Sequence, residues 1–480
     1  MSVTFDPHSA EDDRDTTRLV ASPPEDRPTW PSLRPLVLRL HFYAGVFVAP
    51  FLFVAAVTGF LYACSYQAEK IVYAHELRVP EGKQKLPLSQ QVDAARRAHP
   101  EGTVSAVRPS PDAGTTTRVL LAGTPGAEVG NTLAVFVNPY TAQVRGALEQ
   151  YGTSGALPLR AWIDHLHRDL HLGEPGRLYS EFAASWLWVI TGGGLMLWFA
   201  RRRAARKVRR ASGRRRTLSL HGSVGAWAAV GLFFLSATGL TWSTYAGANI
   251  TELRAALGQE TPIISASAAS GGEHAEHQHM PGMDMGGEDV SHSDKHDVGL
   301  DAAWNAARAE GLSSPLEIVP PGDDSSAYVV QQIQRSWPEK QDAAAVDPTT
   351  GQVTDVVRFA DYPLLAKLSR WGIDLHTGTL FGIVNQAVLA VLALALAVLV
   401  VLGYRMWWQR GRESAFGRPI PRGGWRRVPR YVLALLIALS ALLGYVIPLL
   451  GIPLAGFLVI DSLLGAMDRR RGDQASSPAA

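Results

Sequence analysis

The sequence predicts an α-helical integral membrane protein with about six transmembrane helices in two pseudo-symmetric halves, and two small extracytoplasmic α+β domains. Three observations lead to this fold class. Hydrophobic residues, 47% of the 480, are concentrated in blocks, basic loops lie between blocks, and two groups of motifs recur along the chain. Each nearly uncharged block has about 20 residues or more, enough to cross roughly 30 Å of hydrocarbon as a helix. The blocks are 39–64, 178–200, 218–242, 380–404 and 431–464.

The last block divides in two. Gly444, Pro448, Gly451 and Pro453 lie near its middle. Proline interrupts a helix because it lacks the backbone N–H and its ring clashes with the preceding turn. We therefore expect two short spans joined by a tight turn, which brings the total to six.

The basic loops set the expected orientation. Residues 201–216 contain ten Lys or Arg, residues 410–430 contain seven, and Arg469 to Arg471 follow the last block. Such loops favour the cytoplasmic side, so both termini are expected inside. A nucleic-acid-binding patch is the less favoured alternative, because each run adjoins a span and few aromatic residues interrupt it. We expect membrane lipid, and no nucleic acid, as a partner.

The first 37 residues are rich in proline and in polar and acidic side chains. They do not resemble the basic start of a signal peptide, and we expect a disordered cytoplasmic tail. Cys64, the only cysteine, excludes an internal disulfide; ordinary packing is favoured over lipidation.

Two internal repeats relate the halves. Residues 40–62 and 220–242 both contain Leu-His, sixteen further residues and Thr-Gly, which aligns His41 with His221 and Thr58 with Thr238. A second repeat, at an offset of 209 residues, aligns Trp162 with Trp371, His167 with His376 and Gly173 with Gly382, among others. A repeat of this length predicts that one structural unit occurs twice.

An outer region lies between the paired spans of each half. It ends in alternating apolar residues, an Asn-Pro or Asp-Pro turn and a second short run, at 133–146 and 343–355. This pattern is typical of antiparallel strands. Each region also has a helical stretch, 88–98 or 301–311, so each is expected to be a small α+β domain.

The quoted motifs "RLHFYAGVFVAPFLFVAAVTGFLY", "LHRDLHLGEPGRLYSEFAASWLWVITGGGLMLW", "LHGSVGAWAAVGLFFLSATGL" and "WGIDLHTGTLFGIVNQ" together resemble the PepSY-associated transmembrane family. The resemblance covers roughly residues 36–410 and implies that the outer domains are PepSY-like. Some members of that family are inner-membrane haem proteins that reduce ferric siderophores, and many have no assigned activity. The resemblance implies the plasma (inner) membrane of a bacterium.

The expected organisation follows the chain in order. It comprises a tail (1–37), TM1 (38–64), PepSY-like domain 1 (65–160), an interfacial segment with TM2 (161–200), a basic loop (201–216), TM3 (217–243), PepSY-like domain 2 (244–370) with a His/Met-rich loop (271–297), an interfacial segment with TM4 (371–408), a basic loop (409–430), the TM5–TM6 hairpin (431–466) and a cytoplasmic tail (467–480).

Four histidines recur at the ends of four spans. A histidine there needs a partner, and two neutral imidazoles from facing helices are the usual axial ligands of a six-coordinate haem b. We therefore predict two haems, one held by His41 and His221 on the inner side and one by His167 and His376 on the outer side. The alternative is that these rings only cap helices or reach the membrane surface.

Other histidines are weaker candidates. His165 and His171 are replaced by Asp374 and Leu380 in the second repeat. They are not the preferred haem ligands, and each is an alternative to His167. Trp162 and Trp371 are expected to anchor the outer segments at the membrane interface.

A His/Met-rich segment has no counterpart in the first half. Imidazole and thioether groups together suit copper, with Cu(I) favouring methionine. The alternative is a solvated low-complexity insertion. The candidate copper ligands are His274, His277, His279, Met280, Met283, Met285, His292 and His296.

Two functions follow. The first is a membrane haem-b oxidoreductase that passes electrons to an extracytoplasmic metal chelate, either ferric siderophore-like or copper. The sequence has no nicotinamide or flavin motif, so the donor would be a reductase, free flavin or quinol. The second is a non-enzymatic PepSY membrane protein that binds or restrains a peptidase or another envelope partner.

Overall fold

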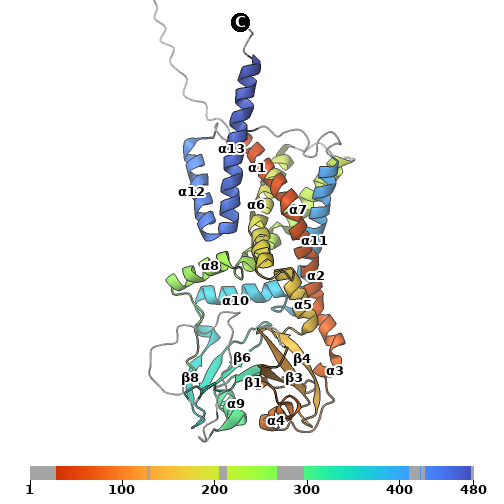
Figure 1. Ribbon diagram of the computed structural model, residues 1–480, viewed down its shortest axis with the longest axis vertical. Helices are drawn as coiled ribbons and strands as arrows, with labels where there is room; N and C mark the ends of the chain where they lie inside the picture. Colours follow the sequence, from red (N-terminus) through yellow and green to blue (C-terminus); the bar gives the residue numbers. More distant parts are fainter. Residues whose placement is uncertain are drawn as a thin grey trace, which may run out of the picture.

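The computed structural model describes residues 29–126, 130–204, 213–266, 297–323, 325–409, 422 and 428–476. These residues form a helical bundle at one end of the molecule and a β-sheet at the other (Figure 1). The C-terminal end of the last described helix, α13 (Pro448–Ser476), lies at the bundle end, away from the sheet.

Five helices of the described chain are long and apolar enough to cross a membrane. The fold is therefore that of a helical membrane protein, as predicted. The helices are α2 (Ala49–Val72), α6 (Glu174–Ala204), α7 (Arg214–Leu240), α11 (Gly382–Trp408) and α13 (Pro448–Ser476). The sixth predicted span is α12 (Arg430–Val446), an apolar helix of 17 residues that is shorter than the other five.

The first membrane span is divided into two helices, whereas the third span is one continuous helix. The first span consists of α1 (Thr29–Phe47) and α2, which meet at Val48. Pro50, in the first turn of α2, lacks the N–H that would bond the carbonyl of Val46. The Tyr404 hydroxyl of α11 donates to this carbonyl instead, at 2.9 Å. The repeat places Val230 opposite Pro50, and α7 runs through that position without a break.

Helix α1 also begins earlier than predicted. Residues 29–37 were expected to belong to a disordered tail, but the helix starts at Thr29. Pro31 falls in the first helical turn, where a proline costs little because its N–H would have no partner within the helix. The remainder of the predicted tail lies outside the described residues.

The C-terminal hairpin packs on the rest of the bundle. Helices α12 and α13 are joined at Ile447, immediately before Pro448. The indole Nε1 of Trp186 in α6 donates to the carbonyl of Leu449. Arg39 in α1 and Asp461 in α13 form a buried ion pair at 2.7 Å, which ties the hairpin to the first helix.

Short helices separate the bundle from the sheet. Helices α8 (Tyr245–Ala256) and α10 (Leu364–Thr377) lie crosswise to the spans between these two layers (Figure 1). The first half has α3 (Ala74–Leu77) and α5 (Pro158–Arg168) in this zone. A 3₁₀ turn, η1 (Phe359–Asp361), precedes α10.

The strands of both outer regions form one sheet. Its eight antiparallel strands run in the order β4-β3-β2-β1-β5-β6-β7-β8. The bounds are β1 (Thr103–Arg108), β2 (Thr117–Ala122), β3 (Asn131–Val137), β4 (Val144–Tyr151), β5 (Leu316–Val319), β6 (Tyr328–Gln332), β7 (Ala343–Val346) and β8 (Val353–Val357).

The expectation of two separate domains therefore needs correction. Strands β1 and β5 pair at Val107 and Ile318, and Arg108 Nε lies 2.5 Å from Glu317 Oε2 beside this pair. Two edge strands leave backbone groups unpaired, and pairing them with one another covers both edges.

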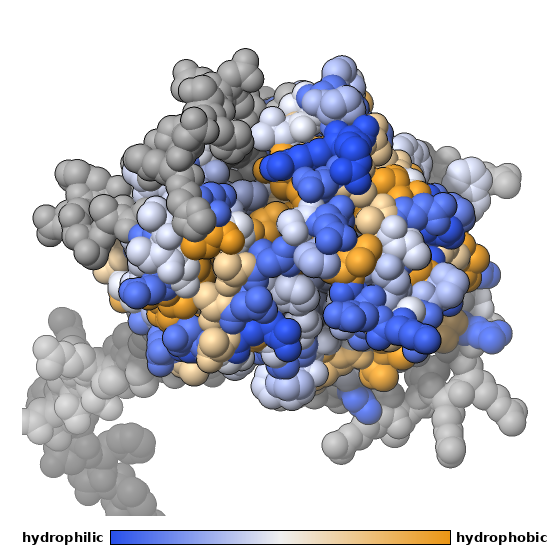
Figure 2. All heavy atoms as spheres, turned by 90° about the horizontal axis from the view of Figure 1, so that it is seen from below, coloured by the Kyte–Doolittle hydropathy of each residue, from blue (hydrophilic) through white to orange (hydrophobic). Residues whose placement is uncertain are grey.

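Two helices cover the sheet face that points away from the bundle. Helices α4 (Leu88–Ala98) and α9 (Gly299–Ala309) pack against alternate residues of the strands, such as Val107 and Val330. The Asp301 carboxylate of α9 accepts hydrogen bonds from the backbone N–H groups of Leu88 and Ser89, and so caps α4. Figure 2 shows this end of the molecule, where hydrophilic residues predominate and hydrophobic ones lie between them.

Candidate cofactor site

The inner pair consists of His41 on α1 and His221 on α7. Their ring centres lie 6.2 Å apart and their planes are inclined at 76°. Two imidazoles that bind one ion from opposite sides, at about 2 Å per nitrogen, leave their ring centres on the order of 6 Å apart. The observed separation fits such a pair.

Backbone carbonyls hold both inner rings. His41 Nδ1 lies 2.8 Å from the carbonyl oxygen of Ile190, and His221 Nδ1 lies 3.1 Å from that of Leu399. A carbonyl only accepts, so Nδ1 is the protonated nitrogen in each ring. Ile190 and Leu399 are themselves aligned by the 209-residue repeat.

Glycines lie against the inner rings. A Cβ atom on Gly194 would lie 3.0 Å from His41 Cε1, and one on Gly403 would lie 3.9 Å from His221 Cε1. These two glycines are also aligned by the repeat. Side chains at these places would reduce the room beside the imidazoles.

The outer pair consists of His167 on α5 and His376 on α10. Thr58 Oγ1 lies 2.9 Å from His167 Nδ1, and Thr238 Oγ1 lies 2.7 Å from His376 Nδ1. Each threonine also bonds the carbonyl four residues earlier in its own helix, at 2.8 Å. A hydroxyl has one proton to donate, so the imidazole Nδ1–H is the donor in each His–Thr contact.

The residues after these threonines are again glycines. A Cβ on Gly59 would lie 3.4 Å from His167 Cε1, and one on Gly239 would lie 3.6 Å from His376 Cε1. The Thr-Gly repeat thus supplies both the ring's hydrogen-bond acceptor and the space beside it.

Nδ1 makes the hydrogen bond in all four rings, within the part of the chain that the structure describes. A hydrogen bond from one ring nitrogen fixes the tautomer and leaves the lone pair of Nε2 for an ion. This is the arrangement that a neutral axial imidazole requires.

The two outer histidines are close enough to affect one another. Burial lowers the pKa of His167, against an opposing effect of Asp164. Burial, with a smaller effect of His167 in its charged form, lowers the pKa of His376 to about 3. Both rings are therefore neutral at physiological pH.

The donor set suits haem better than a bare ion. The described ranges contain no group of three or more His, Cys, Asp or Glu side chains placed to hold a metal ion. A structural or catalytic zinc site needs three or four protein ligands. A haem brings four nitrogens of its own, so two histidines complete its coordination.

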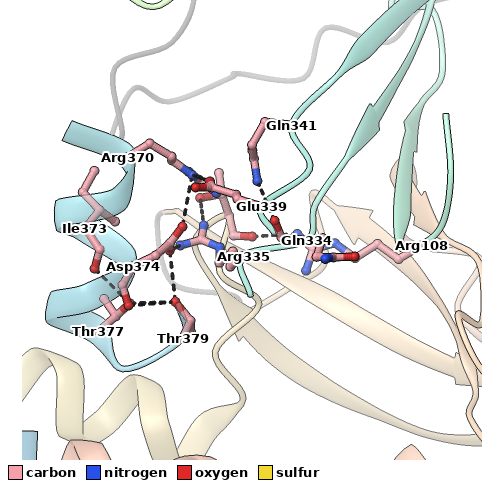
Figure 3. A network of polar contacts seen from close by, with 11 residues as sticks. Arg108, Gln334, Arg335, Glu339, Gln341, Arg370, Ile373, Asp374, Thr377 and Thr379 are labelled. Atoms are coloured by element: carbon pink, nitrogen blue, oxygen red, sulfur yellow. Dashed lines mark hydrogen bonds and ion pairs between the residues drawn. The ribbon is translucent and has the colours of Figure 1, made fainter. Parts of the chain in front are cut away.

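A cluster of ion pairs surrounds Asp374, which precedes His376 by two residues on α10 (Figure 3). Asp374 of α10 contacts Arg335 at 3.4 Å and Arg370 at 3.3 Å, and Arg370 contacts Glu339 at 2.6 Å. Thr379 donates to the Asp374 carboxylate at 3.1 Å. Burial raises the pKa of Glu339 to about 7, although Arg370 opposes the shift.

The remaining predicted residues fall in several places. All eight candidate copper ligands of the His/Met-rich loop lie outside the described residues. Trp162 is 56% exposed, whereas Trp371 packs against Trp337. His165 and His171 line a cavity next to α5.

Sequence reasoning singled out Thr58 and Thr238 as repeated polar residues but gave them no role. In the structure, their hydroxyls bond the outer histidines and so orient the two rings. The repeated Thr-Gly dipeptide is the sequence feature that points to this role. The carbonyls of Ile190 and Leu399 have no such signal, because every residue carries a carbonyl.

A comparison with family models shows which family the chain belongs to. The model of the family described as the PepSY-associated TM region matches residues 38–410. The chain belongs to the PepSY-associated transmembrane family. No curated protein matches it. All four histidines lie within the PepSY-associated match, and α12 and α13 follow it.

Proposed function

We propose that this protein is a membrane haem-b oxidoreductase that moves electrons from a cytoplasmic donor to an extracytoplasmic metal chelate. The observation that carries the proposal is the placement of four histidines, two at each end of the bundle, with Nδ1 of each ring held by a hydrogen bond. When bound, haem supplies one-electron transfer.

The residues of the chain hold and orient that group. His41 and His221 would hold one haem on the inner side, and His167 and His376 a second on the outer side. Ile190, Leu399, Thr58 and Thr238 fix the rings. The first span, formed by α1 and α2, and the third span, α7, each connect the two levels, so both haems would lie along one path across the membrane.

Two further features support the proposed orientation and ancestry. Helix α6 ends and α7 begins in arginines at the bundle end opposite the sheet, which places that end in the cytoplasm under the positive-inside rule. The histidine contacts recur at the repeat offsets, which supports two PepSY-like halves derived from one unit.

The donor is a quinol, a free flavin or a separate reductase, and the acceptor is a ferric siderophore-like or copper chelate outside a bacterial plasma membrane. The His/Met-rich loop would gather copper on that side. These assignments extend the proposal from the chemistry of one-electron transfer to its substrates.

An absorption spectrum of the purified full-length protein tests the proposal. We expect a haem spectrum that changes on reduction with dithionite, and two haems per chain by extraction and pyridine titration. A protein that holds no haem after expression with added haem would contradict it. The remaining function would then be an interaction module for an envelope peptidase or another partner.

A further inference from the structure

A cavity of about 470 Å³ lies between α5 and the edge of the sheet in the first half. Asn131 of β3 and Glu149 of β4 line one side, and Trp162 and His165 of α5 line the other. His171, in the turn after α5, completes the lining. None of these residues takes part in the four-histidine arrangement described above.

We infer that this cavity binds a divalent first-row transition-metal ion, copper(II) most tightly, through Nε2 of His165 and Nδ1 of His171. The inference goes beyond the proposed function and stands without it. It concerns an ion site on the sheet side of the bundle, distinct from both predicted haem pairs.

The two rings are oriented for one ion. Their centres lie 5.9 Å apart, with an angle of 33° between the planes. His171 Nε2 lies 3.0 Å from the carbonyl of Trp162, which only accepts, so the proton is on Nε2 and Nδ1 keeps its lone pair. His165 Nδ1 lies 3.2 Å from the Asp169 carboxylate, which leaves Nε2 of His165 as the donor to an ion.

Asp169 organises both histidines. Its Oδ2 bonds the His165 ring, and its Oδ1 accepts the backbone N–H of His171 at 3.0 Å. The carboxylate is buried. A carboxylate behind a histidine fixes the ring and strengthens the imidazole as a ligand.

The backbone is held in an uncommon conformation at this turn. Leu170 and His171 have φ values of 56° and 55°. Residues other than glycine rarely adopt this left-handed region, and such positions concentrate at functional sites. The conformation presents the His171 ring to Trp162 and His165, with ring centres 5.1 Å and 5.9 Å away.

The charges of the site permit a cation. The Arg168 guanidinium lies 3.4 Å from His165 Nδ1, but it shares the Asp169 carboxylate and also bonds the Tyr151 hydroxyl. Glu149 places a second, exposed carboxylate on the cavity lining. The two carboxylates together outweigh the single guanidinium.

The site would be open. In the described ranges, no three His, Cys, Asp or Glu side chains come together to hold an ion. The chain therefore supplies two nitrogens, and the other coordination positions are left to water or to a chelator. Imidazole suits copper, zinc, nickel and iron, and copper(II) has the highest affinity in this series for a given nitrogen site. A two-nitrogen site can therefore accept an ion that is still partly chelated.

Copper titration of the full-length protein in detergent tests the inference. Wild type, His165→Ala, His171→Asn and the control His99→Ala all keep the His/Met-rich loop, so differences between them report the cavity. His99 is a partly exposed histidine that pairs with Glu101 and does not line the cavity. Asn suits the left-handed backbone at position 171. We expect each cavity variant to bind one copper ion fewer per chain than wild type, with loss of one nitrogen-coupled copper signal in electron paramagnetic resonance. His99→Ala should match wild type.

A fluorescence measurement keeps the test independent of the histidine variants. Copper(II) in the cavity should quench Trp162, so Trp162→Phe should remove one component of the copper-dependent quenching. Equal copper counts and unchanged nitrogen couplings in both cavity variants would overturn the inference, and so would unchanged quenching in Trp162→Phe. These outcomes do not depend on whether the protein holds haem.

Discussion

Helices α5 and α10 carry the same histidine in two different surroundings. In both, the ring donates from Nδ1 to a threonine that is followed by glycine in a spanning helix. Beside α5, however, lies an open cavity with two further histidines. Beside α10 lies a cluster of two half-buried arginines and two buried carboxylates.

The difference follows from single positions of the repeat. His165, Asp169 and His171 in the first half correspond to Asp374, Gly378 and Leu380 in the second. The repeated residues therefore build what both halves share, the His–Thr–Gly contact. The residues that differ give each half its own surface, one open to an ion and one closed by ion pairs.

The largest expected effect tests the shared part. His167→Ala and His376→Ala should each remove one of two haems and halve the haem absorbance, because an axial ligand is lost. His99→Ala, which removes a partly exposed ring that pairs with Glu101, should retain both haems. Absorption spectra of the purified variants give the measurement. A full haem complement in both outer variants would show that His167 and His376 do not hold a haem together.

The next effect concerns the hairpin that follows the family match. Asp461→Ala should destabilise the protein by about 3–5 kcal/mol, because it leaves the buried Arg39 without this carboxylate. Asp468→Ala is the matched control on the same helix, with a side chain that is 58% exposed, and should change stability by about 0–1 kcal/mol. Thermal unfolding in detergent compares them. Similar melting temperatures would show that the ion pair does not hold the hairpin.

The threonines should show equal effects in the two halves. Thr58→Val and Thr238→Val each remove the acceptor for an outer ring and should lower haem affinity by about ten- to a hundredfold. The serine variants should restore it, because they keep the hydroxyl. Rates of haem transfer to apomyoglobin provide the readout; a loss in only one half would break the equivalence of the two contacts.

The smallest expected effect is the pH dependence of stability caused by Glu339, in the second half alone. The pKa of Glu339 is raised from 4.5 to about 7, so the folded state retains a proton that the unfolded chain releases. Its contribution to stability is full below about pH 4.5 and is lost as the pH rises through about 7. Melting temperatures of wild type should fall over this range, and those of Glu339→Gln should change less. Parallel profiles would show that Glu339 is already ionised throughout.

The sequence by itself determined the membrane class, the position of most spans, one helix and one strand-turn-strand segment in each outer region, and the four candidate haem ligands. Each of these features can be recognised from the local periodicity of the sequence or from the internal repeat. Apolar blocks specify spans because bilayer thickness fixes helix length. Histidines at matching positions stand out because the intervening residues vary.

The tertiary structure decided which atoms meet. The joining of two outer regions into one sheet depends on β1 and β5, which are more than 200 residues apart and have no sequence mark of an edge. The capping of the Val46 carbonyl by Tyr404 and the pairing of Arg39 with Asp461 likewise join distant segments. His165 and His171 seemed minor because they do not repeat, yet α5 and its turn bring them to one cavity. Packing in three dimensions sets such contacts, and local sequence patterns report only on neighbours along the chain.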